Sequence, residues 1–282
     1  MTRLQDVLLG MALVALTGMA TPATGCSVDP MCQIDTGEYA ISLPDEDDEL
    51  RPAVLFIHGF GGSGPGVFRN TGMIKAFTDR GYAVIAPNGL PRGNGNGGSW
   101  SFHPQLSQGR DEIAFLTDVR DDVIARHGID PEQIILSGFS IGGSMTAYLA
   151  CAAPDTFAAY APVGGNFWRP HPTECEAPVR MLHTHGWTDG TVPLEGRVLR
   201  GSDSRDPEAL MQGDVFHALS IWRETNECFQ LRADEFVTEG PFLIRKWTRC
   251  APGSALEFAL FPGGHVIPPD WANLTLDWFE AL

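Results

Sequence analysis

Ser140 stands at the centre of Gly138-Phe139-Ser140-Ile141-Gly142, between an apolar run at 134–137 and a helix-compatible stretch. A strand, a tight turn and a helix with serine at the apex form a nucleophile elbow, which holds the hydroxyl clear of the sheet. Glycines suit both flanking positions, because a Cβ atom there would collide where strand and helix cross. The alternative is a glycine-rich turn with an incidental serine. The strand–turn–helix context favours the elbow.

A nucleophilic serine needs a base to take its proton and a carboxylate to orient that base. In elbow-bearing sheets the chain order is serine, acid, histidine. Asp189 lies in a glycine-bounded turn after the strand expected at 179–183, and His265 lies in a Gly/Pro loop after the strand expected at 256–261. The sequence therefore predicts Ser140 as nucleophile, Asp189 as acid and His265 as base.

The remaining histidines fit the role of the base less well. His127 and His217 lie on expected helices, and His103 and His171 precede the acid, which is the wrong order. His58 opens a glycine loop and is expected to be structural.

His183, His185 and Asp189 have a spacing that could hold a metal ion. No fourth ligand follows at short spacing, and Asp189 is already assigned as the acid. We therefore expect no metal and no cofactor.

A glycine loop, His58-Gly59-Phe60-Gly61-Gly62, follows the continuous apolar run at 53–57. Such a loop at the end of a buried strand can turn backbone N–H groups toward an incoming carbonyl oxygen, although a merely flexible loop is the alternative. Its place upstream of the serine favours an oxyanion loop. The predicted oxyanion donors are the N–H groups of Phe60 and Ile141.

Three tryptophans are candidates for the substrate cleft. Trp100 lies in a long Gly- and Asn-rich loop at 88–104, and loops of this length are usually functional or disordered. Trp168 follows a glycine pair, and Trp187 lies in the loop of the predicted acid. Trp100 could equally be a packing plug.

The elements that must position these residues alternate along the chain. Strands are expected at 37–43, 53–57, 82–86, 134–137, 157–163, 179–183, 242–247 and 256–261, and helices at 71–80, 111–127, 144–151, 206–226 and 271–282. Asp206 and Pro207 give the fourth helix its start, which places Asp214 in mid-helix. This alternation predicts an α/β fold with a single doubly wound, mostly parallel sheet flanked by helices.

The chain of 282 residues carries a net charge of −16, with lysine only at Lys75 and Lys246. Binding to phosphate needs a basic footprint, so this charge argues against nucleic acid and against anionic membrane surfaces as partners. An apolar content of 43% is enough for a sizeable core.

The first residues have the pattern of a secretory signal peptide. Arg3 precedes an apolar run at 7–20 that is too short to span a bilayer, and small residues follow it. We expect a signal peptide at 1–25 and a single catalytic domain at 26–282, secreted or periplasmic. The alternative is a degenerate lipoprotein signal with a lipidated Cys26, which would attach the protein to a membrane.

Six cysteines remain after the expected leader, and an even number in an exported chain indicates disulfides. Many pairings are possible. We favour local pairs, because sequence neighbours with turn residues between them close easily. The expected pairs are Cys26–Cys32, Cys151–Cys175 and Cys228–Cys250. None has the two-residue spacing of a zinc knuckle.

Several motifs occur together in order. They are His58-Gly59-Phe60-Gly61-Gly62, Asp130-Pro131, Gly138-Phe139-Ser140-Ile141-Gly142-Gly143-Ser144-Met145, His185-Gly186-Trp187-Thr188-Asp189, Val192-Pro193 and Gly263-Gly264-His265. This ordered set resembles the esterase family of polyhydroxybutyrate depolymerases, LpqC-type esterases and secreted feruloyl or acetylxylan esterases. The resemblance covers about residues 30–280.

The resemblance implies an α/β-hydrolase fold, secretion and hydrolysis of carboxylic esters through Ser140, Asp189 and His265. The implied partner is an ester substrate, with polymeric and plant-cell-wall esters as candidates. The disulfide habit of the family fits Cys151–Cys175 and Cys228–Cys250. The family often has a small residue in place of Trp187 and an aromatic residue in place of Val266. Both departures are expected to reshape the cleft near the acyl group.

Two rival functions share parts of this pattern. A serine peptidase of the prolyl-oligopeptidase kind has the same elbow and triad order, but this chain has no propeller domain to restrict access. A catalytically silent binding module on the same scaffold is disfavoured, because the expected triad and oxyanion residues are intact. The acyl group, the alcohol and the oligomeric state do not follow from the sequence.

Overall fold

The computed structural model describes residues 25–45, 50–93, 95, 97–106, 109–199 and 201–282. The expected signal peptide lies outside these residues, apart from Gly25, and stays a prediction. Within the described residues, none of the helices combines the length and apolar character needed to cross a membrane.

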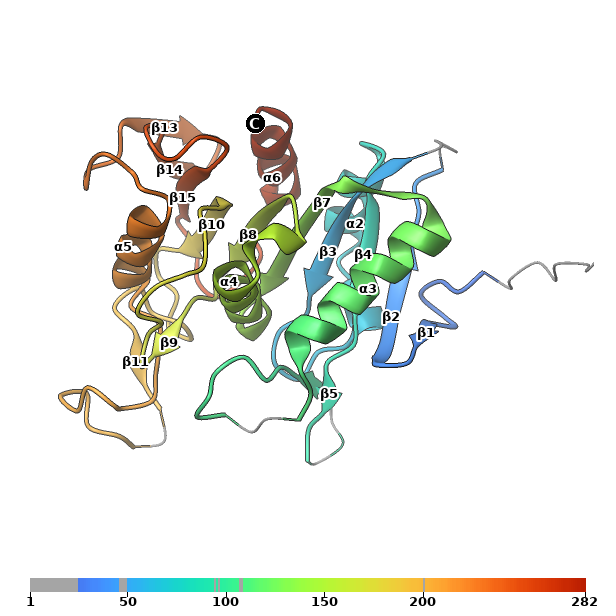
Figure 1. Ribbon diagram of the computed structural model, residues 1–282, viewed down its shortest axis with the longest axis horizontal. Helices are drawn as coiled ribbons and strands as arrows, with labels where there is room; N and C mark the ends of the chain where they lie inside the picture. The colour runs from blue at the N-terminus through green and yellow to red at the C-terminus, as the bar shows by residue number, and fades with distance from the viewer. Residues whose placement is uncertain (1–24, 46–49, 94, 96, 107–108, 200) are drawn as a thin grey trace, which may run out of the picture.

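A ten-stranded sheet runs through the molecule in the order β1-β2-β4-β3-β7-β8-β10-β15-β14-β13 (Figure 1). Its strands are β1 (Cys32–Ile34), β2 (Gly37–Ser42), β3 (Arg51–Ile57), β4 (Ala83–Pro87), β7 (Ile129–Phe139), β8 (Ala159–Val163), β10 (Arg180–Gly186), β13 (Glu235–Glu239), β14 (Phe242–Trp247) and β15 (Ala255–Phe261). The strands from β4 to β15 in this order are parallel, and antiparallel strands flank them on both sides. The expected mostly parallel sheet is confirmed.

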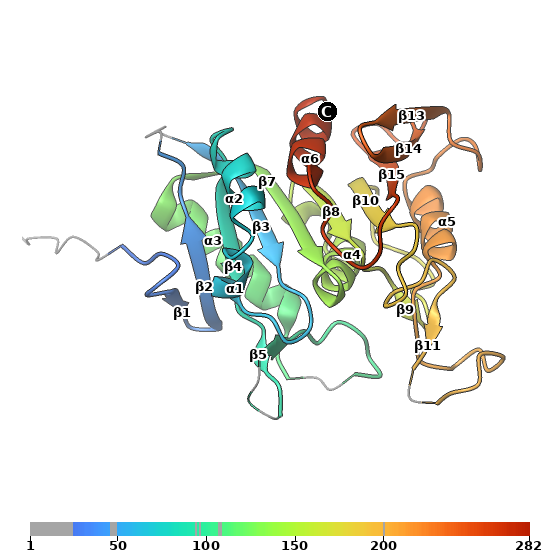
Figure 2. The same ribbon diagram turned by 180° about the vertical axis from the view of Figure 1, so that it is seen from behind.

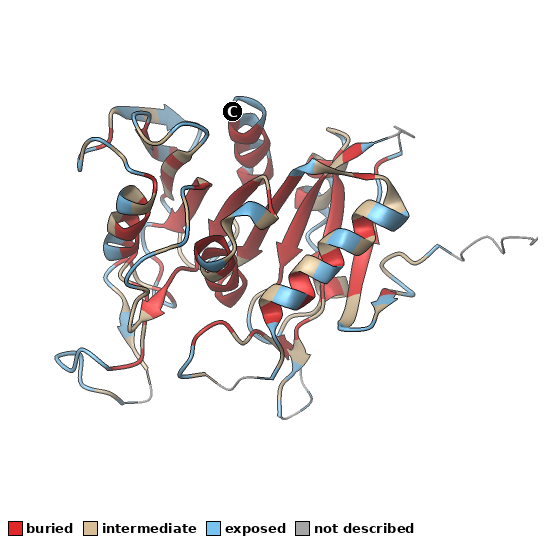
Figure 3. Cartoon of the chain, viewed as in Figure 1, coloured by how far each residue is buried: buried red, intermediate tan, exposed pale blue. Residues whose placement is uncertain are grey.

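Helices cover both faces of the sheet. On one face, α3, α4 and α5 pack over one buried cluster, and on the other face α2 and α6 pack over a second (Figures 1 and 2). The helices are α1 (Gly64–Val67), α2 (Thr71–Thr78), α3 (Glu112–His127), α4 (Ile141–Ala152), α5 (Val215–Thr225) and α6 (Trp271–Glu280), with a 3₁₀ turn at Pro154–Thr156. The central strands are buried along most of their length, as expected of a parallel sheet covered on both faces (Figure 3).

The loops after the parallel strands gather at one end of the sheet, at the lower edge of Figure 1. Two small sheets support them. Their strands are β5 (Leu90–Pro91), β6 (Gly98–Ser99), β9 (Trp168–Arg169), β11 (Arg197–Val198) and β12 (Met211–Gln212). The carboxyl ends of parallel strands are the usual place for a site in such sheets.

The prediction of a helix at 206–226 is wrong for the first part of this range. Helix α5 begins only at Val215, and Asp214 is its N-cap, whose side chain accepts from the N–H of His217 at 3.0 Å. Asp206 instead accepts from the N–H of Glu208 at 2.9 Å in a local turn. The chain between them forms β12, which pairs with β9 and β11, so tertiary pairing overrides the local helix-start signal.

All three expected disulfides are present: Cys26–Cys32, Cys151–Cys175 and Cys228–Cys250. The Cys26–Cys32 pair uses the sulfur that the lipoprotein alternative would need, and that alternative stays a prediction, because its signal residues lie outside the described ones. His127 Nε2 lies 3.8 Å and 3.7 Å from the two sulfurs of the first pair. Because disulfide sulfurs are not thiolates, this group of three is not a metal site.

Candidate active site

Ser140 occupies the sharp turn between β7 and α4. Its backbone has φ 59° and ψ −121°, a conformation that residues with a side chain rarely adopt. A Cβ atom at Gly138 would lie 2.5 Å from the backbone of Gly142, and one at Gly142 would lie 2.2 Å from the carbonyl oxygen of Ile57. The two glycines thus permit the close crossing of strand and helix that the sequence predicts.

The three residues predicted to act together meet at the carboxyl ends of β7, β10 and β15. His265 Nε2 lies 2.9 Å from Ser140 Oγ, and His265 Nδ1 lies 2.7 Å from Asp189 Oδ2. The Phe139 ring packs on the imidazole with centroids 4.7 Å apart. Each distance is within hydrogen-bond range for a nucleophile, a base and an orienting carboxylate.

Asp189 is 5% exposed and is held from both sides. Its Oδ1 accepts from the backbone N–H groups of Thr191 and Val192, each at 2.8 Å, while Oδ2 accepts from His265. Burial acts to raise the pKa of Asp189, but these hydrogen bonds and the nearby imidazole outweigh it and lower that pKa. The carboxylate is therefore ionised at neutral pH, as an orienting acid must be.

The loops of Asp189 and His265 are fixed to each other. The N–H of Trp187 donates to Phe261 O at 2.8 Å, and the N–H of Thr188 donates to Gly263 O at 2.9 Å. A Cβ atom at Gly186 would lie 2.2 Å from Gly264 O. The contact between Asp189 and His265 is therefore set by backbone packing as well as by the side chains.

The loop after β3 runs beside the serine, where a Cβ atom at Gly59 would lie 3.4 Å from Ser140 Cβ. The next N–H groups are engaged: Gly61 donates to Gly98 O at 2.9 Å and Gly62 to Gly59 O at 3.0 Å. Among the described residues, the N–H of Phe60 has no backbone acceptor.

Ile141 is the first residue of α4. The first N–H groups of a helix have no carbonyl partner within it, and the helix dipole favours negative charge there. Both predicted oxyanion donors, the N–H groups of Phe60 and Ile141, are thus without a backbone acceptor in the described part of the chain.

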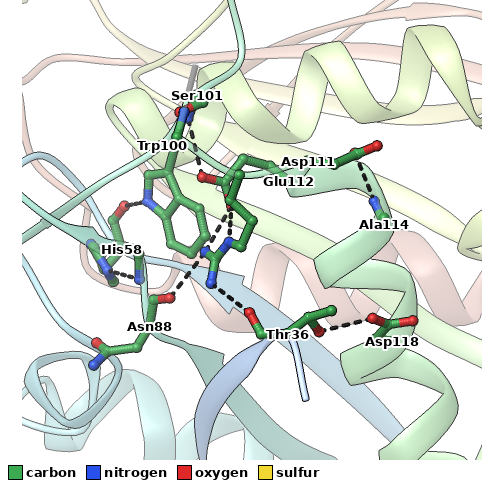
Figure 4. A network of polar contacts seen from close by, with 12 residues as sticks. Thr36, His58, Asn88, Trp100, Ser101, Asp111, Glu112, Ala114 and Asp118 are labelled. Carbon is green, nitrogen blue, oxygen red and sulfur yellow. Dashed lines mark hydrogen bonds and ion pairs between the residues drawn. The ribbon is translucent and has the colours of Figure 1, made fainter. Parts of the chain in front are cut away.

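A polar network behind the glycine loop at 58–62 holds it in place (Figure 4). His58 Nε2 accepts from the N–H of Gly89 at 3.0 Å, so His58 has the structural role expected of it. Trp100 Nε1 donates to His58 O at 2.9 Å, which ties the long loop at 88–104 to the glycine loop.

The same network continues through a buried ion pair. Arg110 and Glu112 are 2.7 Å apart, and Glu112 also accepts from the N–H of Ser101 at 3.3 Å. Arg110 donates further to Asn88 O and Thr36 O. Side chains from three distant parts of the sequence therefore support the loop beside Ser140 (Figure 4).

The three candidate cleft tryptophans occupy different places. Trp100 is 3% exposed, and Trp168 is 7% exposed with Nε1 donating to Ser144 Oγ at 3.2 Å, so both pack within the loops. Trp187 is 64% exposed beside the acid. Phe60 and Val266, from the other two loops of the site, are 61% and 51% exposed.

A cavity of about 570 Å³ borders the glycine loop at 58–62. Its walls include Phe139, which precedes Ser140 in the chain, and Ile267, which lies two residues after His265. Arg69 adds a cation to this lining.

The other histidines lie apart from the serine. His103 is buried, with Nε2 3.3 Å from Pro170 O, and His171 stacks on His217 with ring centroids 4.4 Å apart. His183 and His185 form a buried pair behind Asp189, with facing nitrogens 3.1 Å apart. The sequence suggested only a metal site for this pair and gave no signal that His185 lies against the carboxylate of Asp189.

The fold and this geometry define the class of protein. The family profile described as "alpha/beta hydrolase fold" matches residues 52–212, more than half of the chain, and the chain belongs to that family.

Two relatives narrow the class. NocK of Nocardia uniformis subsp. tsuyamanensis, named as a candidate esterase, is 32% identical over 52% of this chain and 43% of its own length. A protein of Aspergillus niger named as a feruloyl esterase C is 27% identical over 67% of this chain and 70% of its own length. The chain thus spans less than half of the first relative. The expected resemblance to the feruloyl and acetylxylan esterase group is confirmed by relatives with these names.

Solved structures agree on the fold. The acetyl xylan esterase from Aspergillus awamori superposes with a TM-score of 0.64 over 92% of this chain and 97% of its own, at 16% identity. At this identity the likeness shows the shared fold.

Proposed function

We propose that this protein is a secreted serine esterase that hydrolyses carboxylic esters through an acyl-enzyme on Ser140. The observation that carries the proposal is the pair of short distances at His265, 2.9 Å to Ser140 Oγ and 2.7 Å to Asp189 Oδ2. This arrangement gives a nucleophile, a base and an orienting carboxylate in the chain order of the family.

In the first half of the reaction, Ser140 Oγ attacks the ester carbonyl carbon while His265 Nε2 takes its proton. The carbonyl oxygen becomes an oxyanion, which accepts hydrogen bonds from the N–H groups of Phe60 and Ile141. Asp189 stabilises the imidazolium of His265 and holds its orientation. The carbon–oxygen bond to the alcohol then breaks, and His265 returns the proton to the departing alcohol.

In the second half, water attacks the acyl group on Ser140 while His265 takes a proton from that water. The same two N–H groups hold the second oxyanion. When the carbon–oxygen bond to Ser140 breaks, His265 gives the proton back to Oγ and the carboxylic acid leaves. The two halves together consume one water molecule and release the alcohol and the carboxylic acid, and Ser140 and His265 are restored.

The substrate class we propose is an acyl ester carried on a polymer or released from the plant cell wall. The names of the relatives point to feruloyl and acetylxylan esters. The exposed rings of Phe60 and Trp187 lie on two loops of the site and give it an open apolar rim. Secretion is supported by three disulfides, which persist in oxidising compartments.

The first test is Ser140→Ala with a p-nitrophenyl ester. Loss of the nucleophile should lower kcat by about 10⁶-fold while circular dichroism shows a folded protein. Ser220→Ala is the matched control, because Ser220 lies on α5 and bonds only to Phe216 O and Arg223. Near wild-type turnover by Ser140→Ala would refute the assignment.

A panel of substrates separates the rival functions. Acetyl, butyryl and feruloyl esters, soluble hydroxybutyrate oligomers and aminoacyl amides should be compared at equal concentration. We expect hydrolysis of one or more of the esters and none of the amides. Preference for the amides would favour a peptidase, and failure of Ser140 to react with a fluorophosphonate would favour a binding module.

A further inference from the structure

Two histidines inside the sheet lie directly behind the predicted acid. His183 is 1% exposed and His185 is 0% exposed, both on β10. His183 Nε2 is 3.1 Å from His185 Nδ1. On its other side, His185 Nε2 lies 2.8 Å from Val192 O and 3.6 Å from Asp189 Oδ2. The pair therefore leads from the sheet interior to the carboxylate that holds His265.

The partners of these nitrogens fix where the hydrogens are. A carbonyl oxygen can only accept, so His185 Nε2 carries a hydrogen and donates it to Val192 O. Burial lowers the pKa of His183 and of His185, so both rings are neutral at pH 7. A neutral ring has a single N–H, so His185 Nδ1 accepts and His183 Nε2 donates. The hydrogen bonds run in one direction, toward Val192.

This direction of the hydrogen bonds points an N–H of His185, and no positive charge, toward the carboxylate of Asp189. Its Oδ1 is satisfied by two backbone N–H groups, and its Oδ2 accepts from His265 and faces the N–H of His185. Because His185 is neutral, it directs a dipole at the carboxylate without adding a second positive charge. A second charge would compete with the imidazolium that forms on His265 during the reaction.

Three titratable groups of the described residues act on His185. They are Asp189 and His265 from the two loops of the site and His183 on its own strand. From β15, the Phe258 ring packs against His183 with centroids 5.6 Å apart. No other group is therefore needed to explain a change in pH dependence when His185 is replaced.

We propose that His185 is a positioning residue of the triad, held in the required tautomer by His183. It closes the turn from Asp189 to Val192 and so fixes the carboxylate oxygen that orients His265. This inference rests on the proposed esterase triad. The opposing interpretation is that the pair only fills the interior of the sheet, and the two differ in what the pH profile and a conservative variant should show.

The test compares His185→Leu with His185→Gln, using hydrolysis of p-nitrophenyl acetate. Leucine removes the donor, whereas the glutamine amide can donate to Val192 O and accept from His183. We expect His185→Leu to lower kcat by about 10²-fold with little change in KM, since a misplaced group far from the reacting bond has effects of this size. His185→Gln should recover most of that loss. His127→Leu, a partly buried histidine beside the Cys26–Cys32 disulfide, should keep wild-type kcat.

The acid limb of the pH profile of kcat/KM gives a second readout, because it reports titration of the base in the free enzyme. In His185→Leu the turn from Asp189 to Val192 is no longer closed, and the displaced carboxylate stabilises the imidazolium less, so the acid limb should move to lower pH. An acid limb that stays in place or moves to higher pH would overturn the proposal. So would a glutamine variant as impaired as the leucine variant.

A second variant distinguishes misfolding of His185→Leu from loss of the positioning of Asp189. If His185→Leu does not melt as a folded protein, His183→Leu decides, because it leaves His185 in place and removes only the donor to Nδ1. A lower kcat in that variant supports the proposal, and an unchanged kcat overturns it. Fluorophosphonate labelling of the wild type at Ser140 tests the proposed function independently, since absence of labelling refutes the triad itself.

Discussion

At the scale of single residues, what matters near Ser140 is which backbone N–H groups have no acceptor. Gly61 and Gly62 use their N–H groups within the loops, and this leaves the N–H of Phe60 directed to no backbone acceptor in the described part of the chain. A side-chain substitution cannot remove a backbone donor. Proline can, because its ring replaces the N–H.

Phe60→Pro should therefore lower kcat by about 10²–10³-fold, the usual effect of losing one oxyanion donor. Phe60→Ala is its matched control, since it removes the exposed ring and keeps the N–H. We expect the alanine variant to change mainly KM. Kinetics of both variants on one p-nitrophenyl ester check this, and equal kcat in the two would show that the oxyanion is held elsewhere.

Each residue proposed for the triad has a local signal in the sequence. Ser140 lies between two glycines, Asp189 and His265 each lie in a glycine turn after a strand, and the family order links them. The polar network that supports the loop beside Ser140 has no such local signal in the sequence. The contact of Trp100 with His58 joins residues 42 positions apart, and that of Arg110 with Thr36 joins residues 74 apart. Contacts of this kind depend on the finished fold.

At the scale of elements, the ends of α3 and α5 show where a local sequence signal predicts a helix boundary correctly and where it does not. Helix α3 begins and ends as predicted, with Asp111 accepting from Ala114 N at 3.0 Å and Gly128 ending it at φ 64°. At α5, two stretches compete for the start of the helix. Asp206 and Pro207 form the better local signal, yet Asp214 is the cap, because β12 draws the intervening chain into strand pairing.

This correction can be tested on stability. Asp214→Ala should lower the free energy of unfolding by about 1 kcal/mol, as expected for loss of an N-cap side chain. Asp206→Ala should have a smaller effect, because it removes only a turn hydrogen bond to Glu208. Urea denaturation of both variants measures the difference. An equal or larger loss in Asp206→Ala would mean that the helix starts earlier in solution.

At the scale of the whole molecule, three disulfides close loops of very different length. The separations are 6 residues for Cys26–Cys32, 24 for Cys151–Cys175 and 22 for Cys228–Cys250. A crosslink stabilises mainly by restricting the unfolded chain, and the effect grows with the length of the loop. The two longer loops should therefore contribute more to stability than the first.

Paired serine replacements test this. Cys151→Ser with Cys175→Ser, and separately Cys228→Ser with Cys250→Ser, should each lower the free energy of unfolding by about 3 kcal/mol, against about 2 kcal/mol for Cys26→Ser with Cys32→Ser. Chemical denaturation of the three double variants provides the comparison. If the first pair were the most costly to remove, chain restriction would not be the dominant effect.

The backbone of Ser140 has one more consequence, for the evolution of the protein. With φ at 59°, this residue holds a conformation that costs about 1–3 kcal/mol for any residue with a side chain. Glycine would relax that cost but would have no hydroxyl. If Ser140 is the nucleophile that we propose, selection for activity opposes selection for stability at this position. Interactions elsewhere in the sheet must then offset the strain of the turn.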